Sequence, residues 1–259
     1  MRNPWFVRGE PQDQPGVRLF CLPYAGGSAA AYRAWPELAP DSVHVYPLEL
    51  PGRGGRWGET PVSRLALLVE MLADALAGYL DRPYALFGHS MGGLLAFELA
   101  RTVRDRGLLQ PAHLFVSGAA APDLPRTRQP VHAASDTDVL EELRFLGGTP
   151  TEVLNDPALM ELVLPTLRAD FSMLETYRYQ ARPPLAIPMT VLGGDADHLV
   201  ASEELHRWQR QTGAASRLVV LPGDHFFLHP AAPDVMTVIA DALVPVIPEA
   251  VPSPPGNAA

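Results

Sequence analysis

The chain has 259 residues, of which 47% are apolar and 19% are charged, and this length and composition fit one globular domain with a sizeable core. All 20 basic residues are arginines, so the sequence lacks the lysine of a Walker A phosphate loop, of a pyridoxal phosphate enzyme and of a kinase. A formal charge of -9 argues against a general nucleic-acid or anionic-membrane surface, because both require a basic face.

Cysteine content and the N-terminal segment give no sign of secretion. Cys21 is the only cysteine and permits no internal disulfide. The first residues, MRNPWFVRGEP, lack the apolar core of a signal peptide, and no apolar run approaches the ~18 to 20 residues of a membrane helix. The sequence therefore predicts a cytoplasmic protein with no nucleic-acid and no membrane partner.

Short apolar runs rich in β-branched residues alternate along the chain with amphipathic stretches of helical length. In chain order, strands are predicted over residues 17–22, 43–46, 84–87, 113–117, 189–192 and 217–221. Helices are predicted between them, over residues 29–38, 63–80, 91–106, 202–211 and 232–243. This alternation is typical of an α/β fold with a mostly parallel sheet, helices on both faces and ligands at the strand ends.

The alternation is interrupted over residues 122–184, where no strand is predicted and helical patterns occur at 136–145, 157–167 and 169–177. We interpret 122–184 as a helical lid inserted into a core made of residues 1–121 and 185–246. The alternative is a helical bundle that only covers the core. Residues 247–259 are rich in proline and are predicted to form a disordered tail.

The sharpest motif for chemistry is Gly88-His89-Ser90-Met91-Gly92, which follows a predicted strand and precedes a predicted helix. In such a turn the serine is held in a strained conformation, and the flanking glycines keep the neighbouring backbone from clashing. This context predicts that Ser90 is a nucleophile. The alternative is a glycine-rich turn with an incidental serine.

A serine hydroxyl needs an imidazole to accept its proton and a carboxylate to orient that imidazole. Asp195 and Asp197 compete for the orienting role, because both lie in the loop after the predicted strand 189–192. We favour Asp197, which lies deeper in the loop and is followed by His-Leu-Val, as in the Asp-x-x-Val loop of many α/β-hydrolases. Asp195 would then cap the turn through its own backbone.

His225 is the predicted base. It follows the last predicted strand in Gly-Asp-His, at the end of the sheet where the serine turn lies. His89 is inside the turn and is expected to point away from the site. His225 and His229 have a spacing that can bind a metal on a helix, but flanking prolines argue against a helix there, so no metal site is predicted.

The tetrahedral intermediate of acyl transfer needs two N–H donors for its oxyanion. Met91, the residue after the nucleophile, is predicted to supply one of them. The segment 23–28, Pro-Tyr-Ala-Gly-Gly-Ser, follows the first predicted strand, and its small side chains let a backbone amide approach the substrate closely. We assign Ala25 as the second donor, with Tyr24 as the alternative.

Five motifs together resemble the type II thioesterases, discrete α/β-hydrolase enzymes that accompany modular polyketide synthases and nonribosomal peptide synthetases. They span nearly the whole chain and are YAGGS (24–28), LPGR (50–53), FGHSMGG (87–93), LRADF (167–171) and GDHFFL (223–228). The resemblance implies removal of unsuitable acyl groups from the phosphopantetheine arm of acyl or peptidyl carrier proteins, through an acyl-serine. It also implies a catalytic triad, matched here by Ser90, Asp197 and His225, and an oxyanion hole, matched by Ala25 and Met91. The implied enzyme is a monomer that needs no cofactor and contacts carriers transiently.

The chain departs from the family pattern at two places. Gly54-Gly55-Arg56 stands where a glutamate usually follows Pro-Gly-Arg, and Asp224 replaces the second glycine of the usual Gly-Gly-His, which adds a charge beside the predicted base. Carrier proteins are typically acidic, as is this chain, so we expect docking to rely on local arginines or on apolar contact near the lid. The candidate arginines are Arg53, Arg56, Arg126 and Arg128, and ordinary solvated surface is the alternative.

Three other functions are compatible with the same motifs. The first is a small-ester or lipid esterase of the same fold, which relative rates on thioesters and esters would reveal. The second is a non-catalytic docking partner of a synthase, against which the intact Ser, Asp and His weigh. The third is a chain-terminating thioesterase domain cut from a synthase, which the start at Met1 without a carrier-like segment disfavours.

Overall fold

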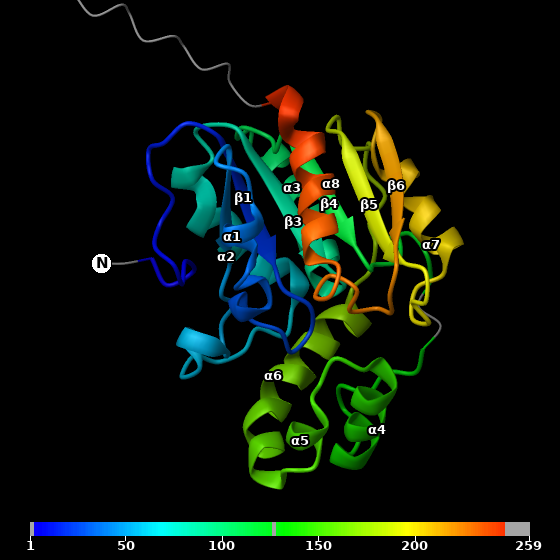
Figure 1. The fold of residues 1–259 in the computed structure, drawn as a ribbon. Helices are drawn as coiled ribbons and strands as arrows, with labels where there is room; N and C mark the ends of the chain where they lie inside the picture. The colour runs from blue at the N-terminus through cyan, green and yellow to red at the C-terminus, as the bar shows by residue number, and fades with distance from the viewer. Residues whose placement is uncertain (1–2, 126–127, 247–259) are drawn as a thin grey trace, which may run out of the picture.

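One parallel sheet of six strands forms the centre of the molecule in the computed structural model, which describes residues 3–125 and 128–246 (Figure 1). The strand order is β2-β1-β3-β4-β5-β6. Residues on β1 and β3 are buried on both faces of the sheet, as expected where helices cover a parallel sheet on each side. The predicted fold class is therefore confirmed. The strands are β1 (Val17–Leu22), β2 (Val43–Pro47), β3 (Tyr84–His89), β4 (His113–Ser117), β5 (Met189–Gly194) and β6 (Ser216–Leu221).

Helices cover the two faces of the sheet and bury two separate apolar clusters. On one face, α1 (Trp35–Leu38) and α8 (Ala232–Leu243) pack on alternate residues of the central strands. On the other face lie α2 (Leu65–Leu76), α3 (Met91–Asp105) and α7 (Ser202–His206). Cys21 of β1 belongs to the first cluster and is fully buried.

Several predicted strands were too short at the carboxyl end of the sheet. Pairing of β3 continues through Gly88 and His89, and pairing of β5 continues through Gly193 and Gly194. The prediction stopped at the last apolar side chain, but the hydrogen bonds of a sheet join backbone groups and do not require apolar side chains. β6 begins one residue early at Ser216, and β2 extends to Pro47.

Two predicted helices are broken in the structure and two are shortened. Residues 29–38 form a 3-10 turn (Ala29–Tyr32) and then α1, while residues 202–211 form α7 and then a 3-10 turn (Arg207–Gln211). The helix predicted over 63–80 is α2 followed by a 3-10 turn, and α3 ends one residue before the prediction. Only α8 has the predicted limits. Helix ends depend on tertiary packing, which propensity does not report.

The segment between β4 and β5 carries α4 (Asp136–Leu146), α5 (Thr151–Leu154) and α6 (Pro157–Thr176), which lie beyond the carboxyl ends of the strands (Figure 1). We predicted two helices where α6 is one helix, which continues through Pro165. Met160 before this proline and Leu167 and Phe171 after it pack with α4 in a small cluster, while Met173 near the end of α6 belongs to the main core. Packing at both ends explains why the proline does not end the helix.

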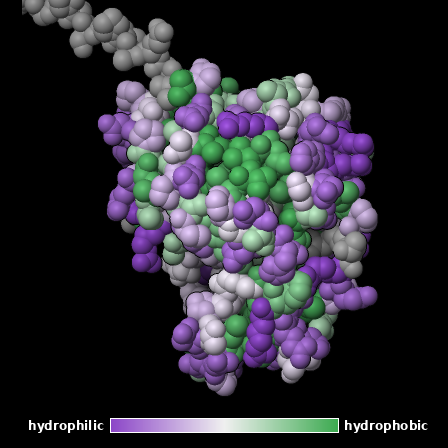
Figure 2. All heavy atoms as spheres, turned by 45° about the vertical axis from the view of Figure 1, so that its right-hand side comes forward, coloured by the Kyte–Doolittle hydropathy of each residue, from purple (hydrophilic) through white to green (hydrophobic). Residues whose placement is uncertain are grey.

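Figure 2 shows a face on which hydrophilic side chains predominate and the broadest apolar patch lies in the upper half. Among the described residues, no helix combines the length and apolar character needed to cross a membrane. The predicted disordered tail at 247–259 and Arg126 lie outside the described residues.

Candidate active site

Ser90 sits at the turn between β3 and α3 in a conformation that few residues adopt. Its φ is 53° and its ψ is -116°, and it is the one non-glycine with positive φ in the part of the chain that the structure describes. A Cβ on Gly88 would lie 1.9 Å from the carbonyl oxygen of Gly92, and a Cβ on Gly92 would lie 2.1 Å from that of Leu22. The turn therefore requires glycine at both flanking positions, as the sequence predicted.

His225 and Asp197 form a buried, hydrogen-bonded pair. Nδ1 of His225 lies 2.8 Å from Oδ2 of Asp197, and the side chains are 5% and 0% exposed. The other oxygen, Oδ1, accepts hydrogen bonds from the backbone N–H groups of Leu199 at 2.8 Å and Val200 at 3.2 Å. Burial by itself raises the pKa of Asp197, but the hydrogen bonds from His225 and the two amides outweigh burial and lower that pKa.

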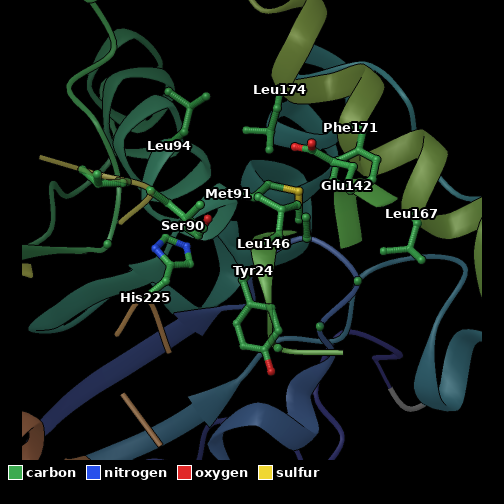
Figure 3. A pocket seen from close by; sticks show the side chains of 18 of the residues that line it. Tyr24, Ser90, Met91, Leu94, Glu142, Leu146, Leu167, Phe171, Leu174 and His225 are labelled. Carbon is green, nitrogen blue, oxygen red and sulfur yellow. The ribbon is translucent and has the colours of Figure 1, made fainter. Parts of the chain in front are cut away.

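The imidazole of His225 lies beside the side chain of Ser90, and both line the same cavity (Figure 3). Because an ionised carboxylate only accepts hydrogen bonds, Nδ1 of His225 carries a hydrogen and Nε2 is left as the acceptor. The elements that carry Ser90, Asp197 and His225 are β3, β5 and β6, whose carboxyl ends meet at one edge of the sheet. The structure thus brings together the three residues that the sequence singled out.

Asp195, the alternative to Asp197, and Asp224, which stands beside the base in the sequence, make other contacts. Oδ1 of Asp195 accepts a hydrogen bond from the N–H of Gly223 at 2.9 Å, which ties the loop after β5 to the loop after β6. Asp224 is exposed, and its Oδ1 accepts a hydrogen bond from the N–H of Phe226 at 2.8 Å. Asp197 is therefore the loop carboxylate that the structure joins to His225.

His89 lies behind the site and does not line the cavity. It is fully buried, its Nδ1 lies 2.9 Å from Oγ of Ser117, and its ring centre is 5.1 Å from that of His225. Burial lowers the pKa of His89 well below its ordinary value, and the neighbouring His225 and His229 lower it further. His89 is thus neutral near pH 7 and does not oppose positive charge on His225.

Met91 and Ala25, the predicted oxyanion donors, line the same cavity as Ser90. Met91 is the first residue of α3, and the first amides of a helix have no acceptor within the helix. Ala25 lies in a turn after β1 that the N–H of Gly27 closes by donating to the carbonyl of Tyr24 at 2.9 Å. The hydroxyl of Tyr24 is hydrogen-bonded to Nε2 of His229 at 3.1 Å.

The cavity has a volume of about 1360 Å³, which exceeds the usual size of a site for one small molecule. Core loops form the side with Ser90 and His225, and α4 and α6 form much of the rest. Figure 3 shows apolar side chains from these two helices facing the space beside Ser90, among them Leu146, Phe171 and Leu174. The side of the cavity formed by α4 and α6 thus combines apolar side chains with a few polar ones, such as Glu142. In the described parts of the chain, no group of three or more His, Cys, Asp or Glu residues is placed to hold a metal ion.

Comparison with known proteins identifies the protein family to which this site belongs. The model of the thioesterase domain matches residues 17–243, which include the whole sheet and α1 to α8. The chain belongs to the thioesterase domain family. The family resemblance and the hydrolase class predicted from the sequence are thereby confirmed.

Relatives of this thioesterase come from biosynthetic pathways. The gramicidin S biosynthesis protein GrsT of Aneurinibacillus migulanus is 42% identical over 227 residues, which cover 88% of this chain and 89% of GrsT. RedJ, a thioesterase from the prodiginine pathway of Streptomyces coelicolor, is 40% identical with a TM-score of 0.83, covering 91% of this chain and 96% of RedJ. BorB, the type II thioesterase of the borrelidin cluster, is 37% identical with a TM-score of 0.84, covering 94% of this chain and 99% of BorB.

Two of the arginines predicted for carrier docking are buried in this thioesterase, and that prediction was wrong for them. Arg53 forms an ion pair with Asp170 on α6, and its side chain is 5% exposed. Arg56 pairs with Glu59, donates to a backbone carbonyl and lies over the ring of Trp5, 4.2 Å from its centre. Neither guanidinium is free to meet a partner, because both groups are satisfied within the fold.

Arg128 is the remaining described candidate, and it lines the cavity. It pairs with Glu142 of α4 at 2.6 Å and lies 4.1 Å from the ring centre of Phe145. Sequence reasoning did not give Asp170 a role, although Asp170 stands in the LRADF motif that contributed to the resemblance. That motif was the available signal.

Proposed function

We propose that this thioesterase hydrolyses acyl groups from the phosphopantetheine arm of carrier proteins and so clears unsuitable groups from a modular synthase. The observation that carries the proposal is the Asp197–His225 pair beside Ser90 in a cavity of about 1360 Å³. Relatives named for gramicidin S, prodiginine and borrelidin biosynthesis support a place in such a system.

The first half of the reaction forms an acyl-serine. Oγ of Ser90 attacks the thioester carbonyl while Nε2 of His225 accepts its proton, and Asp197 stabilises the imidazolium through the 2.8 Å hydrogen bond at Nδ1. The N–H groups of Ala25 and Met91 donate to the oxyanion that develops. The carbon–sulfur bond then breaks, and the carrier thiol leaves with the proton from His225.

The second half returns the enzyme to its starting state. Water gives a proton to Nε2 of His225 and attacks the acyl-serine, and the same two amides hold the second oxyanion. Collapse of this intermediate breaks the ester bond, releases the free acid and restores the hydroxyl of Ser90. Because a thiol leaves readily, the protein mainly needs to position the arm, hold the oxyanion and admit water.

The shape of the cavity supports an extended acyl-arm substrate. The apolar side chains of α4 and α6 give an acyl group a surface to pack against, while the part next to Ser90 has room for the amide-rich arm. We infer that residues 122–184 act as a lid, whose moving part is α4, α5 and the first half of α6. The second half of α6 is fixed, since Thr166 donates to the carbonyl of Gly52 at 2.7 Å and Met173 lies in the core.

We further propose that the enzyme works as a cytoplasmic monomer, needs no cofactor and meets carriers transiently. Docking then involves the rim of the cavity rather than Arg53 and Arg56, because these two are buried. Arg128 and the exposed Trp57 are the rim residues that a carrier would meet first.

The test is mass spectrometry of carrier proteins loaded with a panel of acyl groups, before and after incubation with the enzyme. We expect the loaded mass to fall to that of the free arm, and no change with the Ser90→Ala variant. Rates on matched coenzyme A thioesters and simple esters belong in the same experiment. Folded protein that removes no acyl group, or that strongly prefers a long-chain ester, would contradict the proposal.

A further inference from the structure

Two motifs that the reaction above does not use meet in a buried ion pair. Nη1 and Nη2 of Arg53 donate to the two carboxylate oxygens of Asp170 at 2.7 Å and 2.8 Å. The side chains are 5% and 0% exposed, and the residues are 117 positions apart in the sequence. Such two-point pairing fixes the orientation of the carboxylate, because both oxygens are engaged by one planar group.

The same two side chains hold the turn that carries Ala25. Oδ2 of Asp170 also accepts a hydrogen bond from the N–H of Gly26 at 2.8 Å, and Nη1 of Arg53 also donates to the carbonyl of Gly27 at 3.1 Å. Leu167, one turn before Asp170 on α6, fills the space beside Gly26, where a Cβ would lie 2.7 Å from its Cδ2. Helix α6 therefore contacts the turn through a charge and through packing.

The geometry of the turn explains what this contact does. Gly26 has a φ of 73°, while Ala25 is not among the residues of positive φ, so the turn from Tyr24 to Gly27 is of type II. Types I and II differ mainly by a flip of the central peptide, here the one between Ala25 and Gly26. In the flipped form the carbonyl of Ala25, not the N–H of Gly26, would face the carboxylate of Asp170. Repulsion between these oxygens disfavours the flip. The N–H of Ala25 belongs to the preceding peptide, which the flip does not turn, so the bonds from Asp170 and Arg53 act on it by fixing the position of the whole turn.

We propose that Asp170, oriented by Arg53, is a positioning residue that holds the Tyr24–Gly27 turn against α6 and so keeps the N–H of Ala25 at the place where it meets the oxyanion. The inference rests on the proposed thioester hydrolysis, in which Ala25 is an oxyanion donor. It also gives α6 a function beyond covering the cavity, because this helix sets the geometry of a catalytic loop. Neither Arg53 nor Asp170 lies among the groups that exchange protons in the reaction.

The decisive variant replaces the pair by apolar residues of similar size, Arg53→Met with Asp170→Leu. Replacing both partners leaves no unpaired buried charge, so the fold can persist, whereas Asp170→Ala alone strands a buried guanidinium. We expect the double variant to lose about 10² in kcat, the cost of a misplacement of roughly 1 Å in a catalytic group. The single variant Asp170→Asn keeps one acceptor for Gly26 and is expected to lose less.

A matched control is the pair of Arg101 and Glu98, whose side chains are 3% and 14% exposed and which touches no residue of the turn. Arg101→Met with Glu98→Leu removes a buried ion pair of similar exposure. We expect its kcat to stay within about threefold of the parent enzyme. Thermal unfolding of both double variants shows whether any loss follows stability.

Binding of two inhibitors separates positioning from general damage. A trifluoromethyl ketone analogue forms an oxyanion with Ser90, whereas the matching thioether binds with no oxyanion. In the Arg53/Asp170 double variant we expect the affinity for the ketone to fall by the same factor as kcat/KM. The affinity for the thioether should not change. Equal weakening of both inhibitors, unchanged ketone affinity, or a parent enzyme that does not bind the ketone would overturn the inference.

The ketone measurement does not depend on a carrier protein. If the parent enzyme binds the ketone but removes no acyl group from any carrier, the proposed substrate is wrong. The comparison of the two double variants still decides the role of Asp170 in that case.

Discussion

Replacing Asp197 with asparagine changes one oxygen into an NH2 group and tests how the site sets the tautomer of His225. The N–H groups of Leu199 and Val200 both point at Oδ1, so the carbonyl oxygen of the new amide stays on them. The NH2 group then faces Nδ1 of His225 at the present 2.8 Å contact. Since NH2 only donates, Nδ1 becomes an acceptor and the hydrogen of the imidazole moves to Nε2.

A hydrogen on Nε2 prevents His225 from accepting the proton of Ser90, and the carboxylate that would stabilise the imidazolium is gone. In a serine hydrolase of another fold this substitution costs about 10⁴ in kcat, or about 5.5 kcal/mol of transition-state stabilisation, and we expect a similar loss here. Initial rates of acyl-thioester hydrolysis at saturating substrate measure it.

Asp195→Asn is the matched control, since the Oδ1 of Asp195 only accepts a hydrogen bond, from Gly223, and an amide oxygen can do the same. We expect this variant to keep kcat within about threefold, a change of less than 1 kcal/mol in the barrier. An Asp197→Asn enzyme with more than a tenth of the parent kcat, or an equal loss in both variants, would refute the reasoning.

Three further predictions concern stability and motion. Ser90→Gly should be about 1 kcal/mol more stable than Ser90→Ala. Glycine at this positive φ relieves roughly 1–3 kcal/mol of backbone strain, and the extra conformational entropy that it loses on folding costs about 0.5–1 kcal/mol. Equal denaturation midpoints of the two variants would contradict this. Burial lowers the pKa of His113 to about 4, so the unfolded chain takes up a proton first and the native fold loses stability as the pH falls from about 6.5 to 4. The free energy of unfolding, measured by urea titration, should therefore fall by roughly 2 kcal/mol less between about pH 7 and 4.5 in His113→Gln than in the parent protein. An unchanged pH dependence would refute this assignment. His198→Ala removes a 3.0 Å hydrogen bond to the carbonyl of Phe145, so amide exchange in α4 should rise about twofold to tenfold, and equal exchange would argue against a contact between α4 and the loop after β5.

Motif order along the chain was enough to predict which loops meet. Ser90, Asp197 and His225 each follow a strand of a parallel sheet, and parallel strands place their carboxyl ends at one edge. The glycines around Ser90 and the deeper position of Asp197 in its loop are local features, so the sequence could report them. The sequence could therefore predict these parts of the site, because they depend only on neighbouring residues and on the direction of the strands.

The role of the arginines depends on residues that are distant in the sequence. In the sequence alone, Arg53 looks like a surface residue in a glycine-rich loop. In the structure it pairs with Asp170 of α6, which is 117 positions away. The single helix across Pro165 has the same origin, because packing of its second half into the core opposes the break that proline favours. Such contacts follow from tertiary structure, which a local pattern does not contain.

Burial of Cys21 has a consequence for how the reaction can be followed. Thioester hydrolysis frees a thiol, which a thiol-reactive dye labels, and an accessible thiolate on the enzyme would be labelled as well. Burial raises the pKa of Cys21 well above its ordinary value and keeps the sulfur away from solvent, so the chain has no reactive thiolate to compete for the dye. A thiol-reactive dye added to the native enzyme during turnover therefore reports the freed carrier arm without a contribution from the enzyme.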